Sequence, residues 1–305
     1  MKQNLILSPI INILGKKIRS IIEKSGLTNI EMTDYVLEKF YDNKIGSAYH
    51  INRQRKEALV EKFKEIHQKI PSGTSWLTNV ILATEIFKIS PKVKGDIIEC
   101  GCWKGASTAG LSLVAKIVKR KLIVADSFQG LPEDDKNVIH QYPHVGVFGF
   151  YKKGMYSAGL EEVKKNLSDY GELPVCQFLP GFFANSLKNL KKPIVFAFLD
   201  VDLLTSIKDC IKYIWPRLIN NGYIYTDDSC DMEVVKVWFD NLWWQRILKQ
   251  PAPGYVGSGC GLPISPNYTS LGYAFKVNNP KESYKRVSWL VYPESGKNRS
   301  KKEKR

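Results

Sequence analysis

The most informative segment of the chain for its fold is Asp96-Ile97-Ile98-Glu99-Cys100-Gly101-Cys102-Trp103-Lys104-Gly105. It begins as a short apolar run of the kind found in buried strands and continues into a turn with two glycines. A helical pattern follows from Ser107 to about Arg120, and a second apolar run covers residues 122–125. This order predicts a β-α-β unit, in which a crossover helix joins two parallel strands.

Strand and helix patterns continue to alternate beyond this unit. Apolar residues at three- and four-residue spacing predict helices at about 160–167, 205–215 and 233–244. Short apolar runs predict strands at 175–179, 194–199, 223–225, 271–277 and 287–292, the last two as a closing hairpin. The sequence therefore predicts an α/β, Rossmann-like fold with a mostly parallel sheet and helices on both faces.

Three regions of the chain differ in their patterns. Residues 1–70 have helical spacing throughout and are expected to form a helical N-terminal extension. Residues 71–293 contain the alternating strands and helices and form the predicted α/β domain. Residues 294–305 form a basic tail, in which we expect disorder.

Composition and charge exclude several classes of protein. The 305 residues are 44% hydrophobic, and no apolar run reaches the roughly 20 residues that a membrane-spanning helix needs. The formal net charge is +15, but six of the cations lie in residues 297–305. The remaining excess lacks the aromatic interleaving of a nucleic-acid surface, so nucleic acid is not the expected partner.

The N-terminal segment and the cysteines indicate the cellular compartment in which we expect the protein. Pro9 interrupts the apolar stretch of residues 5–14, and no small-residue cleavage site follows, which argues against a secretory signal. A helix packed on the body is favoured there, and a membrane-surface helix using Lys16, Lys17 and Arg19 is the alternative, with the basic tail as a second membrane contact. The six scattered cysteines indicate reduced thiols and a cytoplasmic protein.

The glycine turn after the first strand is the first candidate site. Gly101 and Gly105 leave room for a ligand beyond the strand end, but Trp103 breaks the three-glycine dinucleotide motif. Glu99 suits a cationic cofactor such as S-adenosylmethionine, and Asp126 ends the next strand, where a carboxylate can accept ribose hydroxyls. In the alternative, the glycines serve packing and Asp126 caps a turn.

Four aspartates form the second candidate site. Asp200 and Asp202 follow one buried strand, and Asp227 and Asp228 follow the next. Clustered carboxylates repel one another unless a cation compensates, and oxygen ligands favour hard ions such as Mg²⁺. A metal together with a carboxylate base can activate a hydroxyl as a methyl acceptor. The alternatives are helix caps and the D-x-D-x-T pattern of aspartate-nucleophile phosphatases, which belongs on an early strand.

Several blocks between residues 71 and 245 together resemble the macrocin O-methyltransferase (TylF-like) family, whose members methylate sugar hydroxyls. The blocks are Asp96 to Gly105, Asp126 to Pro132, Leu199 to Leu203, Pro216 to Leu218, and Gly222 with Asp227 and Asp228. The resemblance implies a class I methyltransferase fold with a seven-stranded sheet. The chain departs from the family pattern at Leu204 and Ser229, where tyrosine is usual.

The resemblance also implies roles for single residues. Asp200, Asp227 and Asp228 would hold Mg²⁺, and Asp202 would act as the general base. The set implied for S-adenosylmethionine is Thr74, Glu99, Gly101, Cys102, Trp103, Gly105, Ser107, Asp126, Ser127, Phe128, Gly181 and Phe182.

The predicted acceptor is a vicinal diol of a sugar or glycan, because a second hydroxyl can also ligate the metal. Two long polar stretches, residues 132–157 and 251–267, are the candidate loops for contact with it. The competing hypotheses are a phosphatase and a non-catalytic, methyltransferase-like module that binds nucleic acid or membrane. Homo-oligomers are common for such proteins, but no pattern here specifies one.

Overall fold

The computed structural model describes residues 29–135, 138–142, 145–148, 151–257 and 271–277. The hypotheses on the N-terminal segment of residues 1–24, on a strand at 287–292 and on the tail at 294–305 lie outside these described residues. Among the helices of the described part, none combines the length and hydropathy that a bilayer-spanning helix requires.

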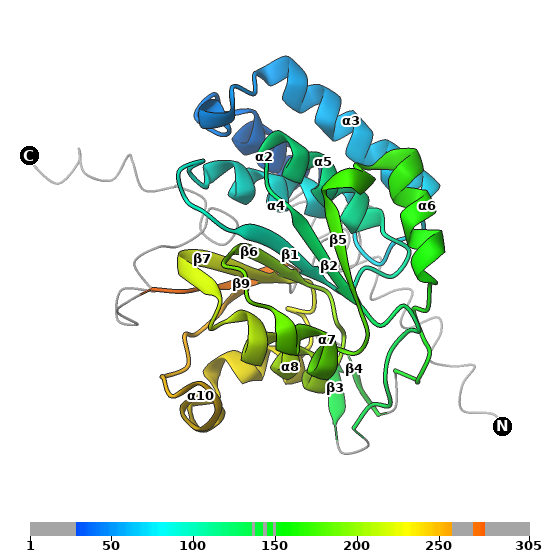
Figure 1. The fold of residues 1–305 in the computed structure, drawn as a ribbon, viewed down its shortest axis with the longest axis vertical. Helices are drawn as coiled ribbons and strands as arrows, with labels where there is room; N and C mark the ends of the chain where they lie inside the picture. Colours follow the sequence, from blue (N-terminus) through cyan, green and yellow to red (C-terminus); the bar gives the residue numbers. More distant parts are fainter. Residues whose placement is uncertain (1–28, 136–137, 143–144, 149–150, 258–270, 278–305) are drawn as a thin grey trace, which may run out of the picture.

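A seven-stranded sheet in the order β5-β2-β1-β6-β7-β9-β8 organises the protein (Figure 1). Five parallel strands make up most of it: β1 (Asp96–Cys100), β2 (Leu122–Asp126), β5 (Cys176–Pro180), β6 (Ile194–Leu199) and β7 (Leu218–Thr226). Two antiparallel strands close one edge: β9 (Gly272–Phe275) and β8 (Val256–Gly257). The predicted mostly parallel, seven-stranded, Rossmann-like sheet is confirmed.

Helices cover both faces of the sheet (Figure 1). One face carries α2 (Asn29–Tyr41), α3 (Arg53–Lys69), α4 (Trp76–Lys88), α5 (Ala106–Ile117) and α6 (Leu160–Tyr170). The other face carries α7 (Phe183–Ser186), α8 (Leu204–Ile214), α9 (Met232–Lys236) and α10 (Asn241–Leu248). Strand residues alternate between the two hydrophobic clusters, Ile97 joining the first and Ile98 the second, because successive side chains of a strand point to opposite faces.

Two sequence expectations need correction. The helix predicted at 233–244 is interrupted: α9 passes into a short 3₁₀ turn, η4 (Val237–Phe239), and α10 then begins anew. The Asp240 side chain accepts a hydrogen bond from the Trp243 amide, which caps the new helix and explains the break. Residues 251–267 were expected to form a loop, yet they contain β8, which pairs with β9 at the sheet edge.

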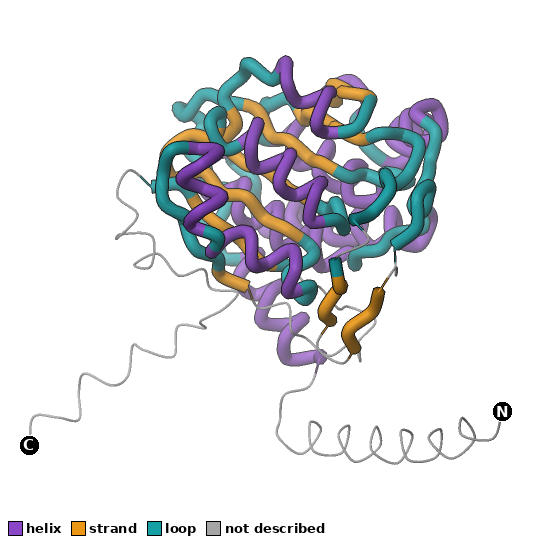
Figure 2. The backbone as a smooth tube through the Cα atoms, turned by 90° about the horizontal axis from the view of Figure 1, so that it is seen from below, coloured by secondary structure: helices purple, strands orange, loops and turns teal. Residues whose placement is uncertain are grey.

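The polar stretch of residues 132–157 also contains regular structure. A two-stranded antiparallel hairpin is formed by β3 (Ile139–Tyr142) and β4 (Val145–Phe148). Figure 2 shows these two strands at the periphery of the molecule, apart from the main sheet.

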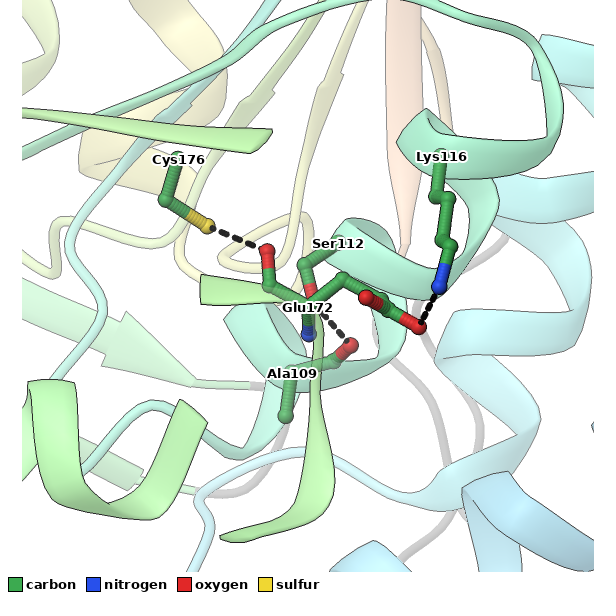
Figure 3. A network of polar contacts seen from close by, with 5 residues as sticks. All are labelled: Ala109, Ser112, Lys116, Glu172 and Cys176. Atoms are coloured by element: carbon green, nitrogen blue, oxygen red, sulfur yellow. Dashed lines mark hydrogen bonds and ion pairs between the residues drawn. The ribbon is translucent and has the colours of Figure 1, made fainter. Parts of the chain in front are cut away.

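Helix α5 anchors the connection between α6 and β5 (Figure 3). The Ser112 hydroxyl donates to the Ala109 carbonyl at 2.6 Å and accepts from the Glu172 amide at 2.8 Å. Lys116 pairs with the Glu172 carboxylate at 2.5 Å, and the Cys176 thiol donates to the Glu172 carbonyl at 3.6 Å. These contacts fix the edge strand β5 against the helix that follows the glycine turn.

Candidate active site

A cavity of about 230 Å³ lies where β1, β2, β6 and β7 end. Its wall includes all four predicted aspartates: Asp200, Asp202, Asp227 and Asp228. It also includes much of the predicted cofactor set: Gly101, Cys102, Trp103, Ser107, Asp126, Ser127 and Phe182. The two sites expected from separate stretches of sequence therefore share one cavity.

Gly101 brings the first strand of the sheet into contact with β6. Its φ is 81°, and a Cβ at this position would lie 1.7 Å from the Asp200 carbonyl oxygen. Only glycine tolerates both the left-handed backbone and this approach. Gly105 also has a positive φ, but its neighbours are Val163 and Leu167 of α6, so it serves packing and does not line the cavity.

Asp126 joins the loops that follow β1 and β2. One carboxylate oxygen accepts from the Cys102 amide and the other from the Phe128 amide, each at 2.7 Å. The next residue, Ser127, donates its hydroxyl to the Gly130 carbonyl at 2.7 Å. The carboxylate is thus held in one orientation at the cavity wall.

Glu99 lies behind that wall, without lining it. Its carboxyl is completely buried and accepts a hydrogen bond from the Ser107 hydroxyl at 2.6 Å. Burial raises the pKa of Glu99 to about 7, because the charged form loses its hydration. Ser107, which does line the cavity, stands between this carboxyl and any ligand.

Three further members of the predicted cofactor set lie at the margin of the cavity. The Thr74 hydroxyl contacts the Ser72 hydroxyl at 3.1 Å and lines a neighbouring hollow. The Phe128 ring meets Phe178 edge to face, and the Gly181 amide donates to the Asp126 carbonyl at 2.8 Å. The structure brings none of these three into the cavity wall itself.

The carboxylates of Asp200, Asp202 and Asp228 converge, each offering an oxygen within 4.8 Å of the others. Asp202 has a left-handed backbone, φ 58°, and its amide donates to the Asp228 carboxylate at 3.1 Å. Burial first, and then the neighbouring carboxylates, raise the pKa of Asp200 and of Asp202 well above the usual range. The structure thus groups Asp202, the expected base, with two expected metal ligands, while Asp227 lies beside them in the wall.

Two tyrosines that sequence reasoning did not single out also line the cavity. The buried Tyr151 side chain is hydrogen-bonded to the Asp202 carboxyl, and the Tyr156 ring meets Trp103 edge to face at 5.6 Å. Both tyrosines belong to the polar stretch of residues 132–157, and that location was the only signal in the sequence. The wall also contains other residues that were not named as site residues, among them Ser72, Phe183, Ser206 and Cys230.

The model of the family described as Macrocin-O-methyltransferase (TylF) matches residues 48–252, well over half of the chain. The chain belongs to this family. The resemblance noted in the sequence is therefore confirmed. The matched residues include the glycine turn and all four aspartates of the cavity, and they end before β8.

Three curated proteins that are similar in sequence to this TylF-family chain are named O-methyltransferases. An 8-demethyl-8-(2,3-dimethoxy-alpha-L-rhamnosyl)-tetracenomycin-C 4'-O-methyltransferase of Streptomyces olivaceus is 31% identical over 45% of this chain and 53% of its own length. A demethyldecarbamoylnovobiocin O-methyltransferase of Streptomyces niveus is 28% identical over 46% and 55%. A mycinamicin III 3''-O-methyltransferase of Micromonospora griseorubida is 26% identical over 57% and 72%. The chain spans about half the length of the first two.

Proposed function

We propose that this protein is an S-adenosylmethionine- and Mg²⁺-dependent O-methyltransferase that acts on a hydroxyl of a sugar or glycan. The observation that carries the proposal is the shared cavity, whose wall contains the glycine turn and Asp126 together with the carboxylates of Asp200, Asp202 and Asp228. A methyl donor bound at the first group would lie next to an acceptor bound at the second. Membership of the TylF family supports this reading.

The cofactor site would be formed by the ends of β1 and β2. The Gly101 turn leaves space beyond β1, and Asp126 presents a carboxylate that two backbone amides hold in place. Carboxylates at this position of a doubly wound fold accept ribose hydroxyls. The bound S-adenosylmethionine would supply an electrophilic methyl group.

The acidic residues fit a hard divalent cation. Three carboxylates converge, and burial, together with repulsion among these groups, raises the pKa of Asp200 and of Asp202 well above the usual range. A bound cation would offset both effects. Asp200 and Asp228, with Asp227 beside them, would hold Mg²⁺, which prefers carboxylate and hydroxyl oxygens. Its chemistry would be to lower the pKa of the acceptor hydroxyl.

Asp202 would act as the general base. Its carboxylate lies in the cavity wall, and the Tyr151 hydroxyl bond orients it. The Asp202 carboxylate would accept the proton of the acceptor hydroxyl. The cofactor, when bound, would supply the methyl group through cleavage of its sulfur–methyl bond and would leave as S-adenosylhomocysteine.

A sugar acceptor agrees with the cavity and with the relatives. One relative is named as a 4'-O-methyltransferase of a rhamnosyl-substituted tetracenomycin C, and another as a mycinamicin III 3''-O-methyltransferase. The aromatic pair of Trp103 and Tyr156 contributes apolar ring surface to the wall of the same cavity. We place the reaction on a vicinal diol, and in the cytoplasm, in keeping with the free thiols of the cysteines in the described part.

Calorimetric titration of S-adenosylmethionine and Mg²⁺ into wild type and Asp228→Asn tests the proposal. We expect both ligands to bind wild type, and the variant to lose Mg²⁺ while keeping the cofactor. Asp169→Asn is the matched control, because Asp169 lies on α6 and pairs with Lys165 at the surface. Failure of wild type to bind the cofactor, with phosphate release from a sugar phosphate, would favour the phosphatase alternative.

A further inference from the structure

Tyr255, which immediately precedes β8, contacts the end of strand β7. Its hydroxyl lies 2.6 Å from the Thr226 hydroxyl, and it is also hydrogen-bonded to the Ser229 side chain. Thr226 is the last residue of β7, and the two contacted residues bracket the pair Asp227 and Asp228. One side chain from a distant part of the chain thus spans the turn that carries two of the acidic residues.

One contact holds the Tyr255 ring, and two backbone contacts hold its neighbours in the chain. The tyrosine stacks on the buried Trp238 ring, with centroids 5.8 Å apart and planes inclined by 20°. The Gly254 amide donates to the Trp238 carbonyl at 3.1 Å, and the next residue, Val256, pairs with Tyr273 of β9. The edge ribbon of β8 and β9 therefore delivers the hydroxyl to a defined position.

Gly272 of β9 makes room for this hydroxyl. A Cβ at Gly272 would lie 2.1 Å from the Tyr255 hydroxyl oxygen, far inside van der Waals contact. The side chain of any other residue would displace the tyrosine or the strand. The glycine and the tyrosine thus form a matched pair, although seventeen positions along the chain separate them.

The bracketed turn is tied to the rest of the site on its other side. The Asp227 amide donates to the Leu199 carbonyl at 3.0 Å, and the Asp228 carboxylate accepts from the Asp202 amide at 3.1 Å. The Ser229 amide in turn donates to the Asp227 carbonyl at 2.8 Å. The tyrosine bonds therefore hold the turn from the side of the edge ribbon, and the bonds to Leu199 and Asp202 hold it from the side of β6.

We infer that Tyr255 is a positioning residue, whose hydroxyl holds the turn of residues 226–229 so that Asp227 and Asp228 keep the spacing that a divalent cation requires. The inference rests on the proposed function, because it assigns the residue to the same metal site. Tyr255 lies beyond the residues that match the family model, which end at residue 252. A neutral phenol suits the task, since it can donate one hydrogen bond and accept another.

The test is direct measurement of Mn²⁺ affinity, with Mn²⁺ as the paramagnetic probe for Mg²⁺, in Tyr255→Phe. We expect the dissociation constant to rise about tenfold, the equivalent of one buried hydrogen bond, with S-adenosylmethionine affinity within about twofold of wild type. Thr226→Val should have the same direction of effect but a smaller one, since it leaves the bond to Ser229 in place, and the double variant should be no worse than Tyr255→Phe alone, because that variant already removes the bond to Thr226. Tyr49→Phe is the matched control, since its hydroxyl donates to the Ile89 carbonyl at a site outside the cavity wall.

The possible results of this test distinguish a failure of the proposed metal site from a failure of the inference about Tyr255. Wild type that binds no Mn²⁺ would overturn the metal part of the proposed function and the inference with it. Wild type that binds, with Tyr255→Phe equal to it, would overturn the inference alone. Loss of cofactor affinity together with Mn²⁺ affinity, and a melting temperature lower than that of Tyr49→Phe, would show a general structural role and would also overturn it.

Discussion

The carbonyl oxygen of Asp200 lies against the Cα of Gly101, at a place where a Cβ would approach it to 1.7 Å. This contact joins the turn after β1 to the first acidic residue after β6, and it explains why the cofactor residues and the carboxylates share one cavity. The Asp200 amide reinforces the contact by donating to the Cys100 carbonyl at 2.9 Å.

Gly101→Ala is expected to separate the two strand ends. The added methyl group cannot be accommodated without moving backbone, and the left-handed φ of 81° adds strain. We expect S-adenosylmethionine affinity to fall more than tenfold, measured by calorimetry, with a loss of about 2 kcal/mol or more in unfolding free energy. Gly159→Ala is the control, because nothing lies within 4 Å of its Cβ position. Equal behaviour of the two variants would contradict the prediction.

Glu99→Gln is expected to change how stability depends on pH. In the folded protein the pKa of Glu99 is about 7, above the ordinary value of 4.5, so the folded state binds the proton more tightly than the unfolded state. Wild type therefore loses unfolding free energy as pH rises from about 4.5 to about 7. Glutamine has no proton to lose at this position, so the variant should not share that loss.

Urea unfolding at pH 5 and pH 8 measures this effect. Between pH 5 and pH 8, wild type should lose about 2 to 3 kcal/mol more unfolding free energy than Glu99→Gln loses. Asp169→Asn, on the surface of α6, serves as the control for a neutralised carboxylate. Parallel pH profiles of wild type and Glu99→Gln would show that Glu99 has no raised pKa.

Tyr151→Phe should slow turnover without weakening cofactor binding. The variant keeps the ring in the cavity wall and removes the hydroxyl that orients the Asp202 carboxyl. We expect kcat to fall about tenfold while the dissociation constant of S-adenosylmethionine stays within about twofold, because a misoriented base affects the reaction step. Tyr170→Phe on α6 provides the control. A rise in KM with unchanged kcat would place Tyr151 in acceptor binding instead.

Ser112→Ala should destabilise the fold at the contact drawn in Figure 3. The buried Ser112 hydroxyl is the acceptor for the Glu172 amide at 2.8 Å, and its removal leaves that amide without this partner. The expected loss is about 1 to 3 kcal/mol of unfolding free energy, measured by urea denaturation. Lys116→Met, which removes only the exposed ion pair with Glu172, should cost less than about 1 kcal/mol. A larger loss of unfolding free energy in Lys116→Met than in Ser112→Ala would contradict the prediction.

Much of the fold follows from local sequence patterns. Asp96–Cys100 and Ile194–Leu199 are strands as expected, because a short run of apolar residues buried on both faces has few other stable conformations. The glycine turn, the crossover helix and the position of the acidic residues at strand ends follow from the same patterns. They predicted two candidate sites, a glycine turn and a group of carboxylates, and in the structure residues of both line the same cavity.

The parallel core, the resemblance to the TylF family and the acidic strand ends can be predicted from sequence alone, because each depends on residues that are neighbours in the chain. Only the tertiary structure decided which carboxylates converge, that Tyr151 meets Asp202, and that Tyr255 reaches Thr226 beside a gap left by Gly272. The physical reason is that these contacts join segments far apart in sequence. Their energies depend on how the sheet edge and the polar loop pack, and no local periodicity records that packing.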